Sequence, residues 1–199
     1  MPRIVLASSN PGKLREFGAL LADSGLEVVP QASLGITDAE ETGLTFVENA
    51  LLKARHAAQA SSLPALADDS GLCVEHLQGA PGLESARYSG GHGDAAANNA
   101  RLLRELDGVP APQRGAFFIC VLVLLQHAND PAPLIAEARW HGQILTEGRG
   151  SGGFGYNPVF LPEGHDQSVA EMDDALKNRL SHRGQALALL HDRLHELHA

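Results

Sequence analysis

The segment from Ile4 to Val29 has the pattern of a strand, a helix and a second strand, and it constrains the fold more than any other part of the sequence. After the short apolar run Ile4–Ala7, Asn10-Pro11 supplies an N-cap and a proline at the first helical position. The apolar positions that follow have helical spacing: Leu14, Phe17, Gly18 and Leu21. Gly25 is expected to end this helix in a left-handed conformation, before a strand at Leu26–Val29. Such an opening predicts an α/β fold.

Further helices are predicted from caps and apolar stripes. A capping box at Thr45 and Glu48 starts a helix that is expected to end near Leu63-Pro64. Asp94 is expected to cap the next helix, whose apolar positions include Leu102, Leu103 and Leu106. Ser181 opens a C-terminal helix with a stripe at Leu187, Leu190, Leu194 and Leu197.

Further strands are predicted, and one of them leads directly into two carboxylates. Ala65–Ala67 is expected to be a short buried strand, which places Asp68 and Asp69 at its carboxyl end, where open α/β sheets bind ligands. The runs from Gly115 to about Gln126 and from Leu134 to Ile144 flank a turn-forming segment. We expect these two runs to pair as a long antiparallel hairpin.

Composition argues against several classes of protein. The 15 lysines and arginines are outnumbered by 24 acidic residues, giving a net charge of −9, which argues against a DNA-binding protein with a broad basic face. Cys73 and Cys120 lack the spacing of a zinc ribbon or a disulfide framework and are expected to be free thiols. The apolar run Ala116–Leu125 has half the length of about 20 residues that a membrane helix needs. Because the first residues also lack the apolar region of a signal peptide, we expect a cytoplasmic protein without nucleic-acid or membrane partners.

Lysine is rare in this chain, which has twelve arginines and only Lys13, Lys53 and Lys177. Lys13 follows the turn that opens the first helix, where backbone N–H groups and the helix dipole favour an anion. The turn lacks the glycine and lysine spacing of a P-loop. It is therefore either a phosphate cradle or an ordinary asparagine cap with an incidental lysine.

The adjacent carboxylates of Asp68 and Asp69 disfavour each other's ionisation unless a cation compensates them. Mg²⁺ is the simplest such cation, and Glu40-Glu41 offers further oxygen ligands. The alternative is that Asp69-Ser70-Gly71 only forms a turn. Since side chains alternate along a strand, only one of the two aspartates is expected to face a given site.

A glycine-rich loop from Gly148 to Pro158 allows close approach of the backbone to a ligand, and Phe154 and Tyr156 are its aromatic residues. An aromatic ring in such a loop is suited to stacking on a base, although a buried anchor for a hairpin end is an alternative. Further along, Ser181-His182-Arg183 presents three kinds of hydrogen-bond donor suited to a carbonyl oxygen, or is an ordinary N-cap followed by charge.

In this order along the chain, the motifs together resemble the inosine triphosphate pyrophosphatase family, the noncanonical purine nucleoside triphosphate pyrophosphatases. The matching segments are Ser8–Lys13, Glu41–Phe46 with Glu48–Ala50 and Lys53-Ala54, Asp68–Leu72, Gly79–Gly82 with Ser85–Tyr88, Gly153–Tyr156, and Lys177 with Ser181–Gly184. The resemblance runs from about Ile4 to Leu190 and includes all the lysines.

The resemblance implies a two-lobed α/β fold of the Maf/Ham type, with a long mixed β-sheet and a central substrate cleft. It implies a single nucleoside triphosphate pyrophosphatase domain over residues 1–199, a homodimer, and Mg²⁺-dependent hydrolysis of ITP, dITP or XTP to the monophosphate and pyrophosphate. Such an enzyme removes noncanonical purine nucleotides from the pool before they enter DNA and RNA.

Carried onto this sequence, the family's site gives each matching residue a role. Asp69 would be the general base and a metal ligand, together with Glu41 or Glu40. The residues that would hold the triphosphate are Ser8, Ser9, Asn10, Pro11, Gly12, Lys13 and Lys53. Ser70 and Lys177 would contact the substrate, Phe154 in the loop with Gly155, Tyr156 and Asn157 would stack on the base, and His182 with Arg183 would donate to the 6-keto oxygen.

One residue departs from the family's pattern, since Asn157 stands where the family usually has aspartate. An amide also donates hydrogen bonds and carries no charge, so the base preference is the part of the resemblance that this residue affects. Two other functions remain open. One is a Maf-type pyrophosphatase that acts on dTTP or UTP, and the other is a nucleotide-binding regulator without catalysis.

Overall fold

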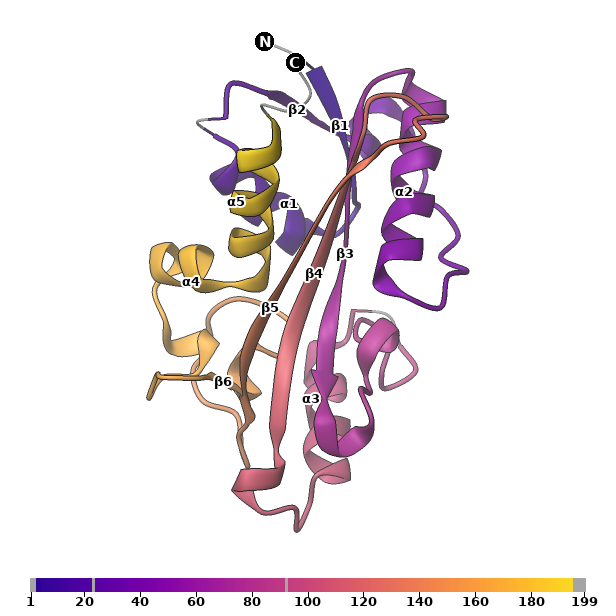
Figure 1. Ribbon diagram of the computed structural model, residues 1–199. Coiled ribbons are helices and arrows are strands. Elements are labelled where there is room, and N and C mark those ends of the chain that lie inside the picture. The colour runs from indigo at the N-terminus through magenta and orange to yellow at the C-terminus, as the bar shows by residue number, and fades with distance from the viewer. Residues whose placement is uncertain (1–2, 23, 92, 195–199) are drawn as a thin grey trace. The chain divides into compact units, whose positions relative to one another are not determined.

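The computed structural model describes residues 3–22, 24–91 and 93–194, and within these ranges six strands form one sheet in the order β2-β1-β3-β4-β5-β6 (Figure 1). The strands are β1 (Arg3–Ala7), β2 (Glu27–Pro30), β3 (Ala65–Val74), β4 (Gly115–Leu125), β5 (Leu134–Ile144) and β6 (Phe160–Pro162). The helices are α1 (Pro11–Leu20), α2 (Phe46–Ser61), α3 (Ala95–Glu105), α4 (Asp174–Leu180) and α5 (His182–Leu194). β1 is parallel to β2 and β3, whereas β5 and β6 are antiparallel, so the prediction of an α/β fold with a mixed sheet is confirmed.

The chain divides into two compact units, and β3, β4 and β5 contribute residues to both. Unit 1 consists of Met1–Asp69, Cys120–Ala138 and Arg183–Ala199. Unit 2 consists of Ser70–Ile119 and Arg139–His182.

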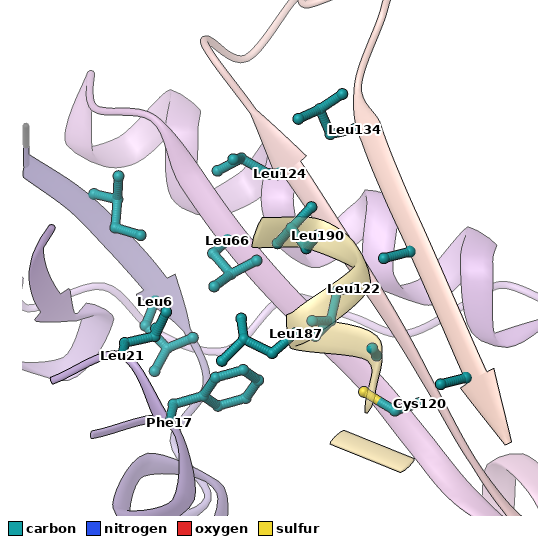
Figure 2. Packing of buried hydrophobic residues seen from close by; sticks show 14 residues of the cluster. Leu6, Phe17, Leu21, Leu66, Cys120, Leu122, Leu124, Leu134, Leu187 and Leu190 are labelled. Atoms are coloured by element: carbon teal, nitrogen blue, oxygen red, sulfur yellow. The ribbon is translucent and has the colours of Figure 1, made fainter. Parts of the chain in front are cut away.

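The core of unit 1 lies between one face of its strands and the helices α1 and α5. Alternate residues of β1 point to opposite faces, so Ile4 and Leu6 join this core. Figure 2 shows Phe17 of α1 and Leu187 of α5 in the same cluster as Leu6. Cys120 of β4 lies at the edge of this cluster, near α5. The opposite face receives α2, whose alanines Ala50, Ala54, Ala57 and Ala58 are buried. These strands are therefore covered on both faces, as the apolar runs predict.

Caps predicted from the sequence are present at three helix starts. Asn10 caps α1, Thr45 accepts a hydrogen bond from the Glu48 N–H at the start of α2, and Asp94 accepts one from Ala97 in α3. The expected end of α1 is wrong, because the helix stops at Leu20 and Gly25 takes its left-handed conformation in the turn before β2. In α5, Leu187 and Leu190 are buried as expected, whereas Leu197 lies outside the described residues.

The predicted end of β3 is wrong, since the strand continues for ten residues to Val74 and passes through both aspartates. Its parallel pairing with β1 nevertheless stops at Ala67, so Asp68 and Asp69 lie just beyond the paired part, level with the carboxyl end of β1. The alternative that Asp69-Ser70-Gly71 only forms a turn is excluded. Distant cations neutralise the two carboxylates and let the strand continue, and a local sequence pattern cannot reveal such partners.

In unit 2, the strands carry an aromatic core that α3 covers. Leu102 of α3 and Leu106, the C-cap of this helix, are fully buried in a cluster with Phe118 of β4 and Trp140 of β5. β6 and α4 are elements that the sequence did not predict, although Asp173 is a regular N-cap for α4 and accepts a hydrogen bond from the Leu176 N–H.

The predicted hairpin is confirmed, because β4 and β5 are hydrogen-bonded neighbours joined by a connection too short for a parallel crossover. The buried Ala116–Leu125 run lies within β4. Cys73 and Cys120 are free, as expected, and both are buried. Among the described residues, no helix is both long and apolar enough to cross a membrane.

Candidate active site

The turn before α1 contains the backbone N–H groups that are predicted to bind an anion. In the structure the Asn10 side chain occupies two of them, because its Oδ1 accepts hydrogen bonds from the N–H of Gly12 at 2.9 Å and of Lys13 at 3.1 Å. Pro11 has no N–H, and the buried Ser8 accepts through Oγ from the Asn10 N–H at 3.3 Å. A phosphate bound here would therefore compete with the asparagine cap for the amides.

Ser9 connects this turn to the loop that carries the two glutamates. Its hydroxyl donates to Asp38 Oδ1 at 2.7 Å and accepts from Gln31 Nε2 at 3.3 Å, and Gln31 also donates to Asp38. The one proton of the Ser9 hydroxyl is thus used within the protein. Its side chain positions the loop in this structure instead of directing a donor at a substrate.

Lys13 is not incidental, because its ammonium forms an ion pair with Oδ1 of Asp68. Oδ2 of the same carboxylate accepts from Arg183 Nε at 3.0 Å and from the Cys120 thiol at 3.1 Å. Arg183 also forms an ion pair with Glu16 of α1. Lys13, Asp68, Arg183 and Glu16 therefore form a row of alternating charges, which we call the buried ion cluster; Lys13 is half-buried and the other three are buried.

The electrostatics of Asp68 are governed by these cations. Burial raises the pKa of the Asp68 carboxyl, but Arg183 and Lys13 outweigh burial and hold that pKa well below its usual range. A carboxylate that is so strongly stabilised is a weak proton acceptor. Asp68 is thus suited to holding cations in place and not to general base catalysis.

Asp69 faces a different partner, as the alternation along a strand predicts. Lys53 of α2 places its Nζ 2.8 Å from Asp69 Oδ1 and 3.3 Å from Glu41 Oε1. Burial raises the pKa of Asp69, and the nearby ammonium groups of Lys53 and Lys13 offset only part of this effect. Asp69 is therefore a better proton acceptor than Asp68.

The loop that bears Glu40 and Glu41 is held at the start of α2. The N–H of Gly43 donates to Asn49 Oδ1 at 2.8 Å, and the N–H of Leu44 donates to Glu48 Oε2 at 2.9 Å. Of the two glutamates, Glu41 reaches the ammonium that also holds Asp69. This favours Glu41 over Glu40 as the partner of Asp69.

The fit of these side chains to Mg²⁺ follows from their number and chemistry. Asp69 and Glu41 converge within 3.3 Å of one ammonium nitrogen, so two carboxylates meet at one place. Among the described residues, no group of three histidine, cysteine, aspartate or glutamate side chains is arranged to hold a metal. Two carboxylates completed by substrate phosphates are a usual set for Mg²⁺, and the residues present fit such a site.

In unit 2, the glycine-rich loop and α4 bring Phe154 and Lys177 together. The Lys177 ammonium lies 5.2 Å from the centroid of the Phe154 ring, within the range of a cation–π contact. Lys177 is buried, whereas Phe154 is half-buried, so part of the ring remains accessible to a ligand. The structure thus brings the two residues together, and the substrate contacts suggested for them by the sequence stay predictions.

The rest of this loop folds around Asn157. The residue is 7% exposed, and its Nδ2 has no hydrogen-bond partner within the part of the chain that the structure describes. A Cβ at Gly153, where φ is +75°, would lie 1.9 Å from that nitrogen, so only glycine fits at this point. Asn99 of α3 donates to the carbonyl of Gly155 at 3.0 Å and ties the loop to this helix.

Two of the predicted substrate contacts, Tyr156 and Arg183, are bound within the protein in the structure. Tyr156 belongs to the core of unit 2 and its hydroxyl donates to the Ser85 carbonyl at 2.9 Å, so it anchors the loop and does not face a base. Arg183 is 2% exposed and bound to carboxylates, which contradicts a direct contact with a base in this conformation. The His182 ring stacks on Phe118 with centroids 4.9 Å apart, and Ser70 is half-buried in β3.

Several functional contacts had no signal in the sequence. Glu16 and Cys120 lie at ordinary helix and strand positions, and their partners are 167 and 52 residues away in the chain. Asp38 and Gln31 are similarly unmarked. Asn99 follows the predicted cap of α3 and could have been singled out as a polar residue on a helix. The sequence would not have indicated that it binds the Gly155 carbonyl.

Comparison with known proteins places the chain in a family. The model of the Ham1 family matches residues 4–193. The dITP/XTP pyrophosphatase of Xanthomonas campestris is 61% identical over 197 residues, which cover 99% of each chain, and that of Ralstonia nicotianae is 58% identical and covers 98% of this chain and 97% of its own length.

Solved structures agree with these relatives. A HAM1 protein from Coxiella burnetii has a TM-score of 0.91 at 48% identity, covering 98% of this chain and 100% of its own. A nucleoside-triphosphatase named dITP/XTP pyrophosphatase from Mycobacterium abscessus has a TM-score of 0.76 at 42% identity, covering 94% and 98%. With the same fold and a family match along almost its whole length, the chain belongs to the Ham1 family.

Proposed function

We propose that this protein is a nucleoside triphosphate pyrophosphatase that hydrolyses dITP, ITP and XTP to the nucleoside monophosphate and pyrophosphate. Relatives that are 55–61% identical over their full length carry the name dITP/XTP pyrophosphatase. The observation that carries the proposal is the convergence of Lys53, Asp69 and Glu41 in unit 1, next to the turn that bears Lys13. In the cytoplasm, this activity would remove noncanonical purines from the nucleotide pool.

In the proposed mechanism, the residues of unit 1 bind the phosphates and move the proton. Lys13 and Lys53 neutralise the charge of the triphosphate, and the turn Ser8–Gly12 lies beside it. Asp69 accepts a proton from a water molecule, whose oxygen then forms a bond with the α-phosphorus. The bond between this phosphorus and the α–β bridging oxygen breaks, and pyrophosphate leaves with the electron pair.

Asp69 and Glu41 would also hold Mg²⁺, with Glu40 as the other candidate in the same loop. The ion supplies electrostatic stabilisation of the charge that develops on the phosphate oxygens. The carboxylate pair around Lys53 supports this assignment, because Mg²⁺ binds through one or two carboxylates and completes its coordination with substrate phosphates.

The residues of unit 2 would bind the base. Phe154 stacks on the purine with its accessible part, and Lys177 reaches the sugar or a phosphate. His182 donates to the 6-keto oxygen of hypoxanthine or xanthine, and we assign this contact to His182 alone because Arg183 is bound to carboxylates. Adenine presents an amino group at this position and would leave the donor unpaired, which costs binding energy.

A substrate panel tests the proposed function directly. We expect pyrophosphate to be released from dITP, ITP and XTP in the presence of Mg²⁺, with little release from ATP, GTP, dTTP or UTP. Pyrophosphate and orthophosphate should be measured separately, because only pyrophosphate identifies the α–β bond as the one cleaved. Activity confined to pyrimidines would instead support a Maf-type pyrophosphatase, and inactivity on every substrate would support a nucleotide-binding regulator.

Asn157 provides a prediction about base preference. Replacing it by aspartate exchanges a buried amide donor for a negative charge, so we expect Asn157→Asp to change the ratio of kcat/KM for ITP to that for XTP. The ratio should be measured on both proteins at one pH. An unchanged ratio would show that Asn157 does not read the base.

The oligomeric state is a separate part of the proposal. We propose a homodimer, on the resemblance to the family. Sedimentation of the protein at micromolar concentration should show a species of twice the chain mass, and a species of only 21.0 kDa would contradict this proposal.

A further inference from the structure

Cys120 lies in β4, fully buried, at a place where an aliphatic side chain would complete the apolar cluster of unit 1. Its neighbours in that cluster on the same strand are Leu122 and Leu124. The thiol is the polar exception on this face, and its Sγ lies 3.1 Å from Oδ2 of Asp68. Figure 2 shows the sulfur at the edge of the apolar cluster, close to α5.

Both carboxylate oxygens of Asp68 have partners, and the partners of the two oxygens differ. Oδ1 binds the Lys13 ammonium. Oδ2 receives Arg183 Nε at 3.0 Å and the Cys120 thiol at 3.1 Å. Two donors from different elements on one oxygen fix the rotation of the carboxylate, and this rotation determines where Oδ1 holds Lys13.

We infer that Cys120 is a positioning residue for the phosphate-binding ammonium of Lys13, acting through the carboxylate of Asp68. This inference rests on the proposed role of Lys13 in binding the triphosphate. Cys120 itself touches neither substrate nor reacting atoms. Its contribution is to hold Asp68 so that the Lys13 side chain remains aligned when the site is empty.

The thiol is in the right protonation state for this role. Burial, together with the negative charge of Asp68, raises the pKa of Cys120 well above its usual value, so the sulfur keeps its proton and donates it. A serine hydroxyl can make the same hydrogen bond, since it is also a neutral donor. An alanine cannot, and it also leaves the space of the sulfur atom empty, so the serine variant and the melting temperatures are needed to separate the hydrogen bond from packing.

The test compares Cys120→Ala with Cys120→Ser in binding inorganic pyrophosphate, measured by calorimetry with Mg²⁺. We expect Cys120→Ala to weaken binding by roughly fivefold, the effect of one lost hydrogen bond, and Cys120→Ser to restore it to about the wild-type value. Cys73→Ala is the matched control, because Cys73 is the other buried thiol and lies in unit 2. Melting temperatures of all variants identify any effect due to stability alone. Equal affinity for pyrophosphate in the alanine and serine variants would overturn the inference.

A double-mutant cycle with Lys13→Met shows whether the effect passes through Lys13. We expect Lys13→Met to weaken pyrophosphate binding strongly, and the addition of Cys120→Ala to weaken it no further. Additive losses would overturn the inference, because Cys120 would then act independently of Lys13. If Lys13→Met alone binds pyrophosphate like the wild type, the proposed phosphate role of Lys13 fails, and the inference fails with it.

Discussion

Asp69→Asn is expected to lower kcat for dITP by about 10²–10⁴-fold, the usual contribution of a general base. The amide has nearly the same shape as the carboxylate but cannot accept the proton of the attacking water. It also removes one of the two negative charges beside Lys53, so KM should change as well. Steady-state kinetics give both constants, and equilibrium binding of dITP shows whether the nucleotide is still bound.

Asp94→Asn is the matched control for this substitution. Asp94 is the cap of α3 in unit 2, where asparagine caps a helix about as well as aspartate does, and we expect wild-type kinetics. A kcat of Asp69→Asn within about tenfold of the wild type would contradict the assignment of Asp69 as the base, because it would lie below the range of base catalysis.

Arg183→Met is expected to lower the free energy of unfolding by about 3–5 kcal/mol, the usual result of removing one partner from a buried ion pair. The methionine fills much of the space, but Asp68 and Glu16 keep buried negative charges without their shared cation. For a chain of this length, the loss corresponds to a fall in Tm of roughly 10 °C. Thermal and urea unfolding measure it, and Arg183→Lys, which keeps the charge, should lose less. An unchanged Tm for Arg183→Met would contradict a stabilising role of the buried ion cluster.

The same variant should show a characteristic dependence on pH. In the wild type, the depressed pKa of Asp68 contributes stability above the unfolded-state pKa, and this contribution is lost as the pH falls through the lower folded-state pKa. Without Arg183, Lys13 remains beside Asp68 but the largest charge that lowers the pKa of this carboxyl is lost, so we expect that pKa to be higher than in the wild type. The difference in the free energy of unfolding between the wild type and Arg183→Met should therefore be smaller at pH 4, which is close to the ordinary pKa of aspartate of about 3.9, than at pH 7.

The sequence predicts the elements whose signals are local. Asn10-Pro11, Thr45 with Glu48, and Asp94 mark helix starts correctly, because a cap bonds to backbone groups two or three residues away. The predicted end of β3 was wrong because it depends on residues that are distant in the chain. β3 continues past Asp68 beside β4, and Arg183, which compensates the charge of Asp68, is 115 residues away in the chain.

The candidate site divides in the same way. Lys13, Lys53 and Asp69 could be singled out from residue type and position, and the structure brings Lys53 and Asp69 into contact. The roles of Arg183 and Tyr156 could not be predicted from the sequence. A guanidinium or a phenol group can bind a ligand, and it can equally form hydrogen bonds inside the protein. Their burial and their hydrogen bonds to Asp68 and Ser85 decide between the two.

The scarcity of lysine has a practical consequence for chemical labelling. All three lysines of the chain are described, and none is exposed: Lys13 and Lys53 are in ion pairs, and Lys177 is buried beside Phe154. An acylating reagent would thus find no fully exposed lysine, and only the half-buried Lys13 and Lys53 would be partly accessible to it. The rate at which Lys13 and Lys53 are acylated, followed by mass spectrometry, would then report the occupancy of the proposed phosphate site with little background from other lysines.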